Sequence, residues 1–443
     1  MKHAVILALS AALAVSSLAG CSSENGTGIS ETTQAEAPSQ AAGGAVQPSS
    51  EAAPEASGKK VTIEFFHQKY ENVDLYNKII PQFMEENPDI QVNITMGETT
   101  TTTFVSRVAS GNVPEMVSLF PMSQTYVQMA KQGIFKDLSG LGYEAAINES
   151  IFDRCKVDGT TYFIPLNTNA YGLWYNVDMF EENGWKVPST YEELWEFCET
   201  LKAQGIQAFT FPDKNGTRIA QSFDRMLVGC VNHDFGALCS DIKAGTYDLT
   251  KDQEFIDYAA SLCKLREYAN PDSLGYGDEA SYDEFINGKC AMMVEGTWAL
   301  STFLSMKPDC NIKMAALPVM TEEEFYTTGT VDTGYGISAD VTEEEFEACK
   351  RLMEFMLRDD IAQQFVDWDK NPTAFKNVTY SVDQLMEINN LIAENRYQPC
   401  LSTIWTQDLR NAINEEIQAL LLDQDIQVFV ERVQELIQEY YSE

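Results

Sequence analysis

The chain has 443 residues, of which 44% are hydrophobic and 22% are charged, so it is long enough to form two hydrophobic cores rather than one. Its 67 Asp and Glu residues outnumber its 30 Lys and Arg residues and give a formal net charge of -37. A surface this acidic repels phosphate backbones, which argues against nucleic acid as a partner. Solubility alone explains the acidity, and charge by itself identifies no ligand.

The first 20 residues have the features of a secretory signal peptide. Lys2 and His3 form a short basic start, and residues 5–18 are apolar or small but too few to span a membrane as a mature helix. The run ends in Leu18-Ala19-Gly20-Cys21, which is similar to a bacterial lipobox. We therefore expect cleavage before Cys21, lipidation of Cys21, and attachment to the extracellular face of the cytoplasmic membrane through that lipid alone. The alternative is an ordinary signal peptide followed by a chance cysteine.

Residues 21–59 are predicted to be a flexible linker, because Ser, Ala, Gly, Pro, Gln and Glu leave almost no large apolar side chain to bury. Nine further cysteines contain no C-x-x-C pair, so they make a poor disulfide framework. Either these cysteines form one or two disulfides and the rest stay thiols, or they are all buried thiols in a host that lives without oxygen. The apolar neighbours of most of them favour buried thiols. Three histidines in the whole chain argue against a histidine-based metal site, and we expect neither metal nor cofactor.

The folded part begins near Lys60 with an alternation of apolar residues, Val61, Ile63 and Phe65, that predicts a strand. A helical period over residues 75–84 follows, and a second alternation over residues 90–94 predicts another strand. Strand, helix and strand in this order indicate an α/β fold. Later apolar stripes predict helices over residues 255–262 and 426–440.

Four hydroxyl residues each precede an acid or amide by three positions, the pattern of a helix capping box. These pairs predict helix starts at Thr190/Glu193, Thr250/Gln253, Ser281/Glu284 and Thr342/Glu345.

Several motifs from residue 60 onward resemble, in order and spacing, those of the extracellular solute-binding proteins of sugar ABC importers, the maltose-binding-protein-like family. They are Ala109-Ser110-Gly111-Asn112-Val113-Pro114-Glu115, Gly133-Ile134-Phe135-Lys136-Asp137-Leu138, Asp158-Gly159-Thr160-Thr161-Tyr162-Phe163-Ile164-Pro165, Tyr175-Asn176-Val177-Asp178, Pro188-Ser189-Thr190-Tyr191-Glu192-Glu193-Leu194, and Phe285-Ile286-Asn287-Gly288-Lys289 followed by Ala291-Met292 and Gly296-Thr297-Trp298. Glycine at 159 suits a tight hairpin turn, and glycines at 288 and 296 are expected to let the backbone turn beside a cleft.

The resemblance implies a type II periplasmic-binding-protein-like α/β fold, in which two lobes close on a ligand by hinge motion. Lobe 1 would contain residues 60–167 and 325–370, and lobe 2 would contain residues 168–312 and 371–443. The chain would cross between lobes near Asn167, at about 312–330, and again over residues 368–372.

The resemblance also implies a function. The protein would bind a mono- or oligosaccharide, catalyse no reaction, act as a monomer, and deliver the ligand to the permease subunits of an ABC importer.

A sugar presents hydroxyl groups and an apolar face, so its site needs aromatic platforms and planar polar side chains. By resemblance Trp298 and Trp405 are stacking residues, and Asn169 stands where relatives carry an acid that bonds sugar hydroxyls. Residues that follow strands or border the crossings complete the expected site, since ligands bind at strand ends in α/β sheets. These residues are His67, Gln68, Phe120, Glu295, Asp332 and Tyr335. For His67, Phe120, Glu295 and Asp332, a core or surface role is an equal alternative.

Other interpretations remain open. Paired carboxylates in a cleft could make a glycosidase, but 67 acids make such a pair expected by chance, and no G-x-S-x-G, H-E-x-x-H or P-loop motif is present. Acids clustered around aromatic rings could instead bind a polyamine, and a peptide is a further possible solute. A surface adhesion or sensor protein could use the same fold.

Overall fold

The computed structural model describes residues 60–96, 100–214, 218, 235–319, 327–394 and 396–441. The expected signal peptide, Cys21, the linker and Cys230 lie outside these residues. The strands are β1 (Val61–His67), β2 (Ile90–Thr95), β3 (Met116–Leu119), β4 (Phe163–Asn176), β5 (Gln207–Phe209), β6 (Cys290–Gly296), β7 (Ile312–Ala315), β8 (Thr327–Ile337) and β9 (Tyr397–Pro399).

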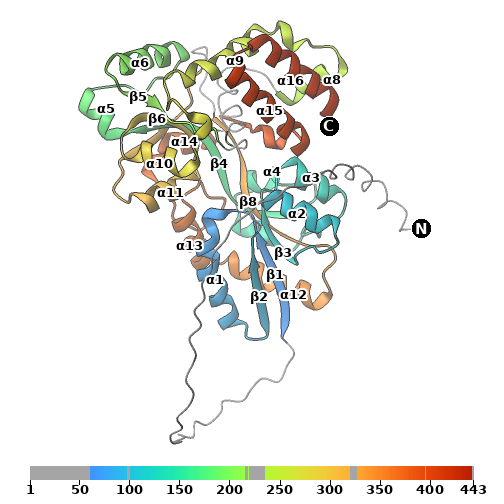
Figure 1. Cartoon of the computed structure of the whole chain (residues 1–443). Helices are drawn as coiled ribbons and strands as arrows, with labels where there is room; N and C mark the ends of the chain where they lie inside the picture. Colours follow the sequence, from blue (N-terminus) through green and yellow to red (C-terminus); the bar gives the residue numbers. More distant parts are fainter. Residues whose placement is uncertain are drawn as a thin grey trace, which may run out of the picture. The chain divides into compact units, whose positions relative to one another are not determined.

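Helices surround these strands (Figure 1). The α-helices are α1 (Val73–Glu86), α2 (Thr100–Ala109), α3 (Gln124–Lys131), α4 (Glu149–Arg154), α5 (Val177–Asn183), α6 (Tyr191–Ala203), α8 (Phe235–Ala244), α9 (Gln253–Arg266), α10 (Asp278–Ile286), α11 (Ala299–Met306), α12 (Glu343–Met356), α13 (Asp359–Asp369), α14 (Met386–Ala393), α15 (Gln407–Asp423) and α16 (Ile426–Tyr440). The short 3-10 helices are η1 (Tyr70–Asn72), η2 (Tyr143–Ala146), η3 (Leu249–Lys251), η4 (Ser273–Gly275), η5 (Asp383–Leu385) and η6 (Leu401–Thr403). The elements predicted from periodicity, namely β1, α1, β2, α9 and α16, are therefore confirmed.

The strands form a mixed sheet in the order β2-β1-β3-β8-β4-β6-β5, with β7 paired to β4 and β9 paired to β8. β1 is parallel to both β2 and β3, and β8 runs antiparallel to β3 and β4. The first half of β4 pairs with β8, and its second half pairs with β6 and β7. Strand β4 is therefore paired with strands from both ends of the sheet.

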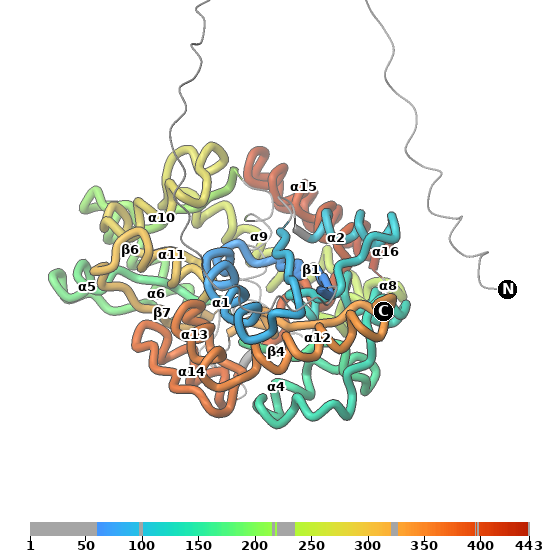
Figure 2. The backbone as a smooth tube through the Cα atoms, turned by 90° about the horizontal axis from the view of Figure 1, so that it is seen from below, coloured from blue at the N-terminus to red at the C-terminus, as the bar shows by residue number. Residues whose placement is uncertain are grey.

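Two hydrophobic cores are connected by the paired strands β4 and β8. The first core contains side chains of β1, α1, β3, α12 and α13 and extends to Ala374 and Phe375, and Figure 2 shows α12 and α13 returning beside α1. The second core contains side chains of α6, β6, α9, α11, α15 and α16. The pairing register of β4 with β8 shifts between Pro165 and Thr168, where the strand passes from one core toward the other. Such an irregularity bends a strand. The lobe boundaries expected from the resemblance stay a prediction.

The predicted helix caps have mixed outcomes. Thr342 and Glu345 form the complete capping box at the start of α12, and Thr190 accepts a hydrogen bond from the Glu193 backbone N–H at the start of α6. The other two predictions are wrong. Asp252, not Thr250, caps α9, because its carboxylate is closer to the helix start and accepts from the Phe255 N–H. Ser281 lies inside α10, which begins after Gly277.

The glycines in the matched motifs serve different purposes. Gly159 has a φ of 83°, which confirms the predicted tight turn, and Gly288 has a φ of 68°. Gly296 is not in that conformation. It is required by space, since a Cβ there would lie 2.2 Å from the ring of Trp298. The chain does turn directly after Gly296, at residues 297 and 298, but the glycine is required there by space rather than by a positive φ.

Among the described residues, the thiols of Cys155, Cys198, Cys239, Cys263, Cys290, Cys310 and Cys349 form no disulfide, and all of them except the half-buried Cys263 are buried. The favoured interpretation of buried thiols is confirmed for them. No helix in the described ranges is long and apolar enough to cross a membrane.

Candidate functional site

Polar residues follow β1 at the edge where β1 and β3 both end. The backbone N–H of Gln68 donates to Ser118 O of β3 at 3.0 Å, and the Gln68 side chain donates to Thr101 Oγ1 of α2. The backbone N–H of Phe120 donates to Gln68 Oε1 at 3.4 Å. Two predicted site residues of this edge, Gln68 and the half-buried Phe120, are therefore hydrogen-bonded to each other.

His67 is 1% exposed, and its ring packs 4.9 Å from the ring of Tyr76. Its Nδ1 lies 3.2 Å from the carbonyl oxygen of Lys69. Because a carbonyl can only accept, Nδ1 carries the hydrogen. Burial lowers the pKa of His67 to about 4, against a smaller opposing effect of this hydrogen bond. The imidazole is therefore neutral at neutral pH and acts as a packed, hydrogen-bonded side chain.

Lys69 lies at the centre of a buried polar group that the sequence did not predict. Its Nζ is 2.6 Å from Asp332 Oδ2 and 2.6 Å from Asp369 Oδ1, and the three side chains are 2–5% exposed. Burial alone would lower the pKa of Lys69, but the charges of Asp332 and Asp369 outweigh it and raise the pKa above its ordinary value. The ammonium group is therefore charged and shared by two carboxylates from β8 and α13.

Two amides complete what we call the crossing cluster, formed by Lys69, Asn167, Asp332, Asp369 and Asn371. Asn167 Nδ2 donates to Asp369 Oδ2 at 2.5 Å, and Asn371 Nδ2 donates to the same oxygen at 2.8 Å. Two predicted crossing segments contribute to this cluster, through Asn167 on β4 and through Asp369 and Asn371 at the end of α13, and Asp332 on β8 lies just beyond the third, residues 312–330. The cluster therefore connects the strands that join the two cores.

The predicted residue Asn169 is brought directly to this cluster. Its Nδ2 donates to Asp332 Oδ1 at 2.7 Å, and its Oδ1 accepts from the backbone N–H of Thr330 at 3.1 Å. Asn169 is half-buried, whereas the residues of the cluster that it borders are buried. Two of the predicted site residues, Asn169 and Asp332, thus meet although they are far apart in the sequence.

The turn between β6 and α11 approaches the cluster from the second core. Thr297 Oγ1 lies 2.5 Å from Asn371 Oδ1 and can donate to it, and the Thr297 N–H donates to Ala170 O at 2.9 Å. The neighbouring Trp298 is 8% exposed and meets the ring of Tyr171 edge-on at 5.2 Å. The hydrogen bonds of Thr297 therefore hold the adjacent Trp298, the predicted stacking residue, beside the crossing cluster.

Glu295 is fully buried on β6 and belongs to a second charged group. Arg218 Nη1 lies 3.6 Å from Glu295 Oε1, and Arg218 Nε lies 2.9 Å from Asp278 Oδ1. Burial by itself would lower the pKa of Arg218, but nearby negative groups, including Glu295 and Asp278, outweigh burial and raise the pKa above its ordinary value. Burial raises the pKa of Glu71 in η1, while Lys69 and Arg218 oppose that shift. Arg218 thus acts electrostatically on a residue next to the crossing cluster.

Two predicted aromatic residues lie deeper in the cores. Trp405 is 2% exposed, donates its indole N–H to Cys239 Sγ at 3.2 Å, and packs 5.6 Å from the ring of Phe235. Tyr335 is 2% exposed and donates to the hydroxyl of Tyr76 at 3.4 Å within the first core. The roles predicted for Trp405 and Tyr335 in ligand contact stay predictions.

Sequence reasoning missed Lys69, Glu71, Arg218 and Asp369. One signal was available for Lys69, because it directly follows His67 and Gln68 after the first strand. Asp369 lies beside Trp368 in a segment that was itself a predicted crossing. No set of three or more His, Cys, Asp or Glu side chains in the described part of the chain is arranged to hold a metal ion.

Known proteins resemble this chain in sequence and in fold. The "Multiple sugar-binding protein" of Streptococcus mutans is 27% identical over 356 residues, which are 79% of this chain and 84% of that protein. The structure of "SBP RafE in complex with raffinose" matches with a TM-score of 0.74 and 25% identity, covering 86% of this chain and 99% of that one. A "Chitin oligosaccharide binding protein" has the same fold, with a TM-score of 0.75 at 22% identity and coverage of 86% and 99%.

These likenesses confirm the mixed α/β fold expected from the resemblance, that of the periplasmic solute-binding proteins. The family described as "Bacterial extracellular solute-binding protein" matches residues 78–387, more than half of the chain. Strands β4 and β8 both lie within the matched residues, and this chain belongs to the bacterial extracellular solute-binding proteins.

Proposed function

We propose that the protein captures an uncharged carbohydrate outside the cytoplasmic membrane and delivers it to the permease of an ABC importer. The observation that carries this proposal is the crossing cluster, where amides and carboxylates are gathered beside Trp298 between two cores. Amide and carboxylate oxygens accept hydrogen bonds from sugar hydroxyls, and an indole ring can pack against the apolar face of a sugar. The names of the sugar-binding relatives support the same ligand class.

The charges of the cluster favour a neutral ligand over a polyamine. A polyamine site needs carboxylates that lack a counter-ion, but Asp332 and Asp369 already share the ammonium of Lys69 at 2.6 Å. A second ammonium there would meet the charge of Lys69 in a buried setting, where like charges repel strongly. Paired carboxylates nevertheless keep lone pairs that can accept from hydroxyl groups.

The proposed mechanism is capture by closure. A ligand that contacts both Asn169, beside the cluster, and Trp298, on the second core, stabilises the closed arrangement and shifts the population toward it. The protein acts as a monomer and performs no chemistry on its ligand. A lipid at Cys21 would hold it beside the permease and raise its effective concentration there.

Thermal unfolding of the purified protein against a panel of glycans, with spermidine and short peptides included, tests this proposal. A ligand at about 100 times its dissociation constant stabilises the folded state by about 2.7 kcal/mol, which raises the melting temperature measurably. We expect one glycan class to raise the melting temperature and to be recovered chemically unchanged. Stabilisation by spermidine or a peptide alone would replace the carbohydrate by that solute. Hydrolysis of the stabilising glycan would revive the glycosidase alternative.

As a control for site assignment, Trp298→Ala is compared with Trp174→Ala. Trp174 is fully buried in the second core, and its indole donates to Gly296 O at 3.2 Å. Both changes lower stability, but only Trp298→Ala is expected to weaken glycan binding at least tenfold at a temperature where both variants are folded. Parental affinity in Trp298→Ala would remove Trp298 from the site.

A further inference from the structure

A series of hydrogen bonds between buried side chains runs from the end of β1 to the turn that precedes α11. Lys69 Nζ donates to Asp369 Oδ1 at 2.6 Å, and Asn371 Nδ2 donates to Asp369 Oδ2 at 2.8 Å. Because the amide nitrogen of Asn371 faces a carboxylate, its Oδ1 is the atom that faces Thr297. Thr297 Oγ1 therefore donates to Asn371 Oδ1, at 2.5 Å. The series ends at Thr297, which directly precedes Trp298.

Asn371 is held on the first-core side of the point where β4 passes between the cores. Leu166 of β4 belongs to the first core, and so does Ala374, whose backbone N–H donates to Leu166 O at 2.9 Å. The backbone N–H of Thr168 donates to Pro372 O at 2.8 Å. The residues that follow Asn371 are therefore bonded to β4 before β4 enters the second core.

Thr297 is held on the other side of this point. Ala170 of β4 belongs to the second core. The Thr297 N–H donates to Ala170 O at 2.9 Å, and the Ala170 N–H donates to Thr297 Oγ1 at 3.3 Å. The hydrogen bond from Thr297 to Asn371 therefore spans the residues over which β4 changes cores. A rotation of one core against the other at this point changes the distance between the two ends of the bond.

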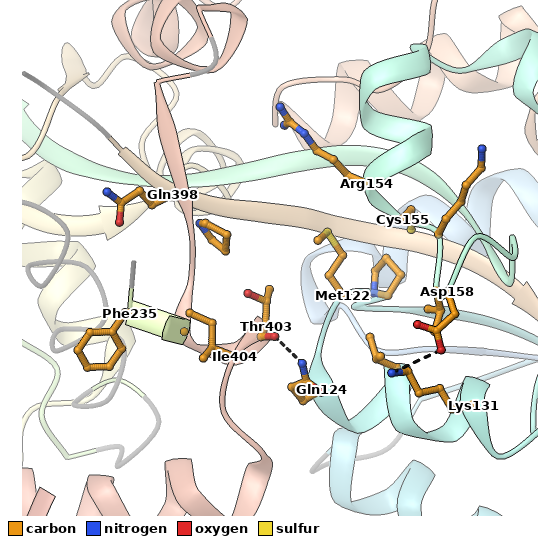
Figure 3. Close-up of a pocket in the computed structure, with 16 residues that line it drawn as sticks. Met122, Gln124, Lys131, Arg154, Cys155, Asp158, Phe235, Gln398, Thr403 and Ile404 are labelled. Atoms are coloured by element: carbon orange, nitrogen blue, oxygen red, sulfur yellow. Dashed lines mark hydrogen bonds and ion pairs between the residues drawn. The ribbon is translucent and has the colours of Figure 1, made fainter. Parts of the chain in front are cut away.

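The two sides of the molecule touch in the arrangement described here. A cavity of about 630 Å³ is lined by residues of both α3 and η6, and Gln124 Nε2 donates to Thr403 O at 2.7 Å across it (Figure 3). Helix α3 contributes side chains to the first core, and η6 contributes to the second. The hydrogen bond between Thr297 and Asn371 is thus present in a closed arrangement of the two cores.

We infer that this hydrogen bond is a latch, which favours the closed arrangement before any ligand is bound. Both side chains are buried, so a rotation that separates them leaves a hydroxyl hydrogen and an amide oxygen without each other in the interior. The net contribution of one hydrogen bond changes an equilibrium constant by about two- to tenfold. The latch regulates the proposed ligand site by changing the closed population, so its effect on affinity rests on the proposed function.

Single-molecule energy transfer in the purified, ligand-free protein tests the latch. Dyes are attached through unnatural amino acids at Lys78 of α1 and Glu192 of α6, two exposed positions on helices that pack against different cores. Thr297→Val removes the hydroxyl and keeps the shape of the side chain. We expect it to lower the ratio of closed to open molecules by about three- to tenfold. Thr297→Ser keeps the hydroxyl and should retain the ratio of the parent protein.

Thr168→Val is the matched control for the loss of a buried hydroxyl. Thr168 Oγ1 lies 3.4 Å from Pro372 O, in the same pair of segments, but both residues are on one side of the crossing in β4. This variant should change the ratio less than twofold. In an Asn371→Ala background, Thr297→Val should have a clearly smaller effect than in the parent, because the bond is already lost. An unchanged ratio in Thr297→Val, or equal effects of Thr297→Val and Thr168→Val, would overturn the latch.

Affinity for a glycan that stabilises the parent protein gives a second measurement. Thr297→Val should bind that glycan about three- to tenfold more weakly, because a smaller fraction of the molecules is closed. A lowered ratio with unchanged affinity would overturn the regulation of the site. If no glycan binds the parent and Thr297→Val still lowers the ratio, the latch stands and the carbohydrate proposal falls.

Discussion

The pairing of Lys69 with two aspartates makes a single residue critical for stability. Removing one partner of a buried ion pair leaves uncompensated charge in the interior, which costs about 3–5 kcal/mol. We therefore expect Lys69→Met to lower the free energy of unfolding by that amount, since Asp332 and Asp369 would lose their shared counter-ion. Chemical denaturation measures this change.

Lys156→Met is the matched control for that substitution. Lys156 also pairs with an aspartate at 2.6 Å, but its side chain is 34% exposed and that of Asp153 is 55% exposed. Exposed pairs contribute up to about 1 kcal/mol. Equal effects of the two substitutions would show that burial does not set the importance of Lys69.

The buried His67 predicts a dependence of stability on pH. Its pKa in the folded state is about 4, below the ordinary value near 6.5, so between these values the unfolded chain binds the proton and the folded protein does not. Stability from this residue is complete above about pH 6.5 and falls as pH decreases toward 4, by about 3 kcal/mol in total. The difference in unfolding free energy between the parent and His67→Gln should follow this window. A difference independent of pH would show that His67 titrates normally.

At the scale of elements, helix α9 shows how capping chemistry selects a helix start. Asp252 accepts from the Phe255 N–H at 3.1 Å and is the N-cap, whereas Thr250 lies in η3 and donates to Asp248 at 2.6 Å. We expect Asp252→Ala to destabilise the protein by about 1 kcal/mol and Thr250→Ala to cost less. The reverse order in chemical denaturation would restore Thr250 as the cap.

The turn after β6 depends on the close fit of Gly296 and Trp298. A methyl group at 296 would lie 2.2 Å from the indole, so Gly296→Ala should cost about 1–3 kcal/mol through overpacking. In a Trp298→Ala background the same change should cost clearly less, because the obstructing ring is gone. A double-mutant cycle of unfolding free energies measures this coupling, and additive effects would contradict the steric explanation.

Element types were predictable where one periodicity dominates, as in β1, α1 and α16. The starts of α9 and α10 were not, because several hydroxyl and acidic residues within a few positions compete for the same backbone donors. The site was predictable in part. Asn169 and Asp332 were found as residues near the predicted crossings, but the partner of Asp332 is Lys69, 263 residues away, and only the fold of the chain brings them together.

At the scale of the whole molecule, the buried thiols report how the two cores open. Burial raises the pKa of Cys290 in the second core and of Cys349 in the first, so neither reacts readily while the protein is folded. We expect peptide-resolved alkylation to modify the half-buried Cys263 at least tenfold faster than either.

The same experiment in mild denaturant tests whether the cores open together. Because β4 and β8 connect them, Cys290 and Cys349 should become reactive over the same range of denaturant. Reaction of one thiol well before the other would show that the cores unfold separately.

The late completion of the first core also has a consequence for the order in which the chain can fold. The first core begins with β1 at residue 61 but is completed only by β8, α12, α13 and Phe375. During synthesis or passage through a pore, β1 meets its strand partners β2 and β3 early. Strand β3 lacks its other partner β8, and β1 lacks the packing of α12 and α13, until residues about 220–310 positions later have emerged. Such long separations slow folding. For most of its emergence the chain has one edge of β3 unpaired and the first core incomplete, and a factor that shields nascent strands would have its greatest effect on this half of the protein.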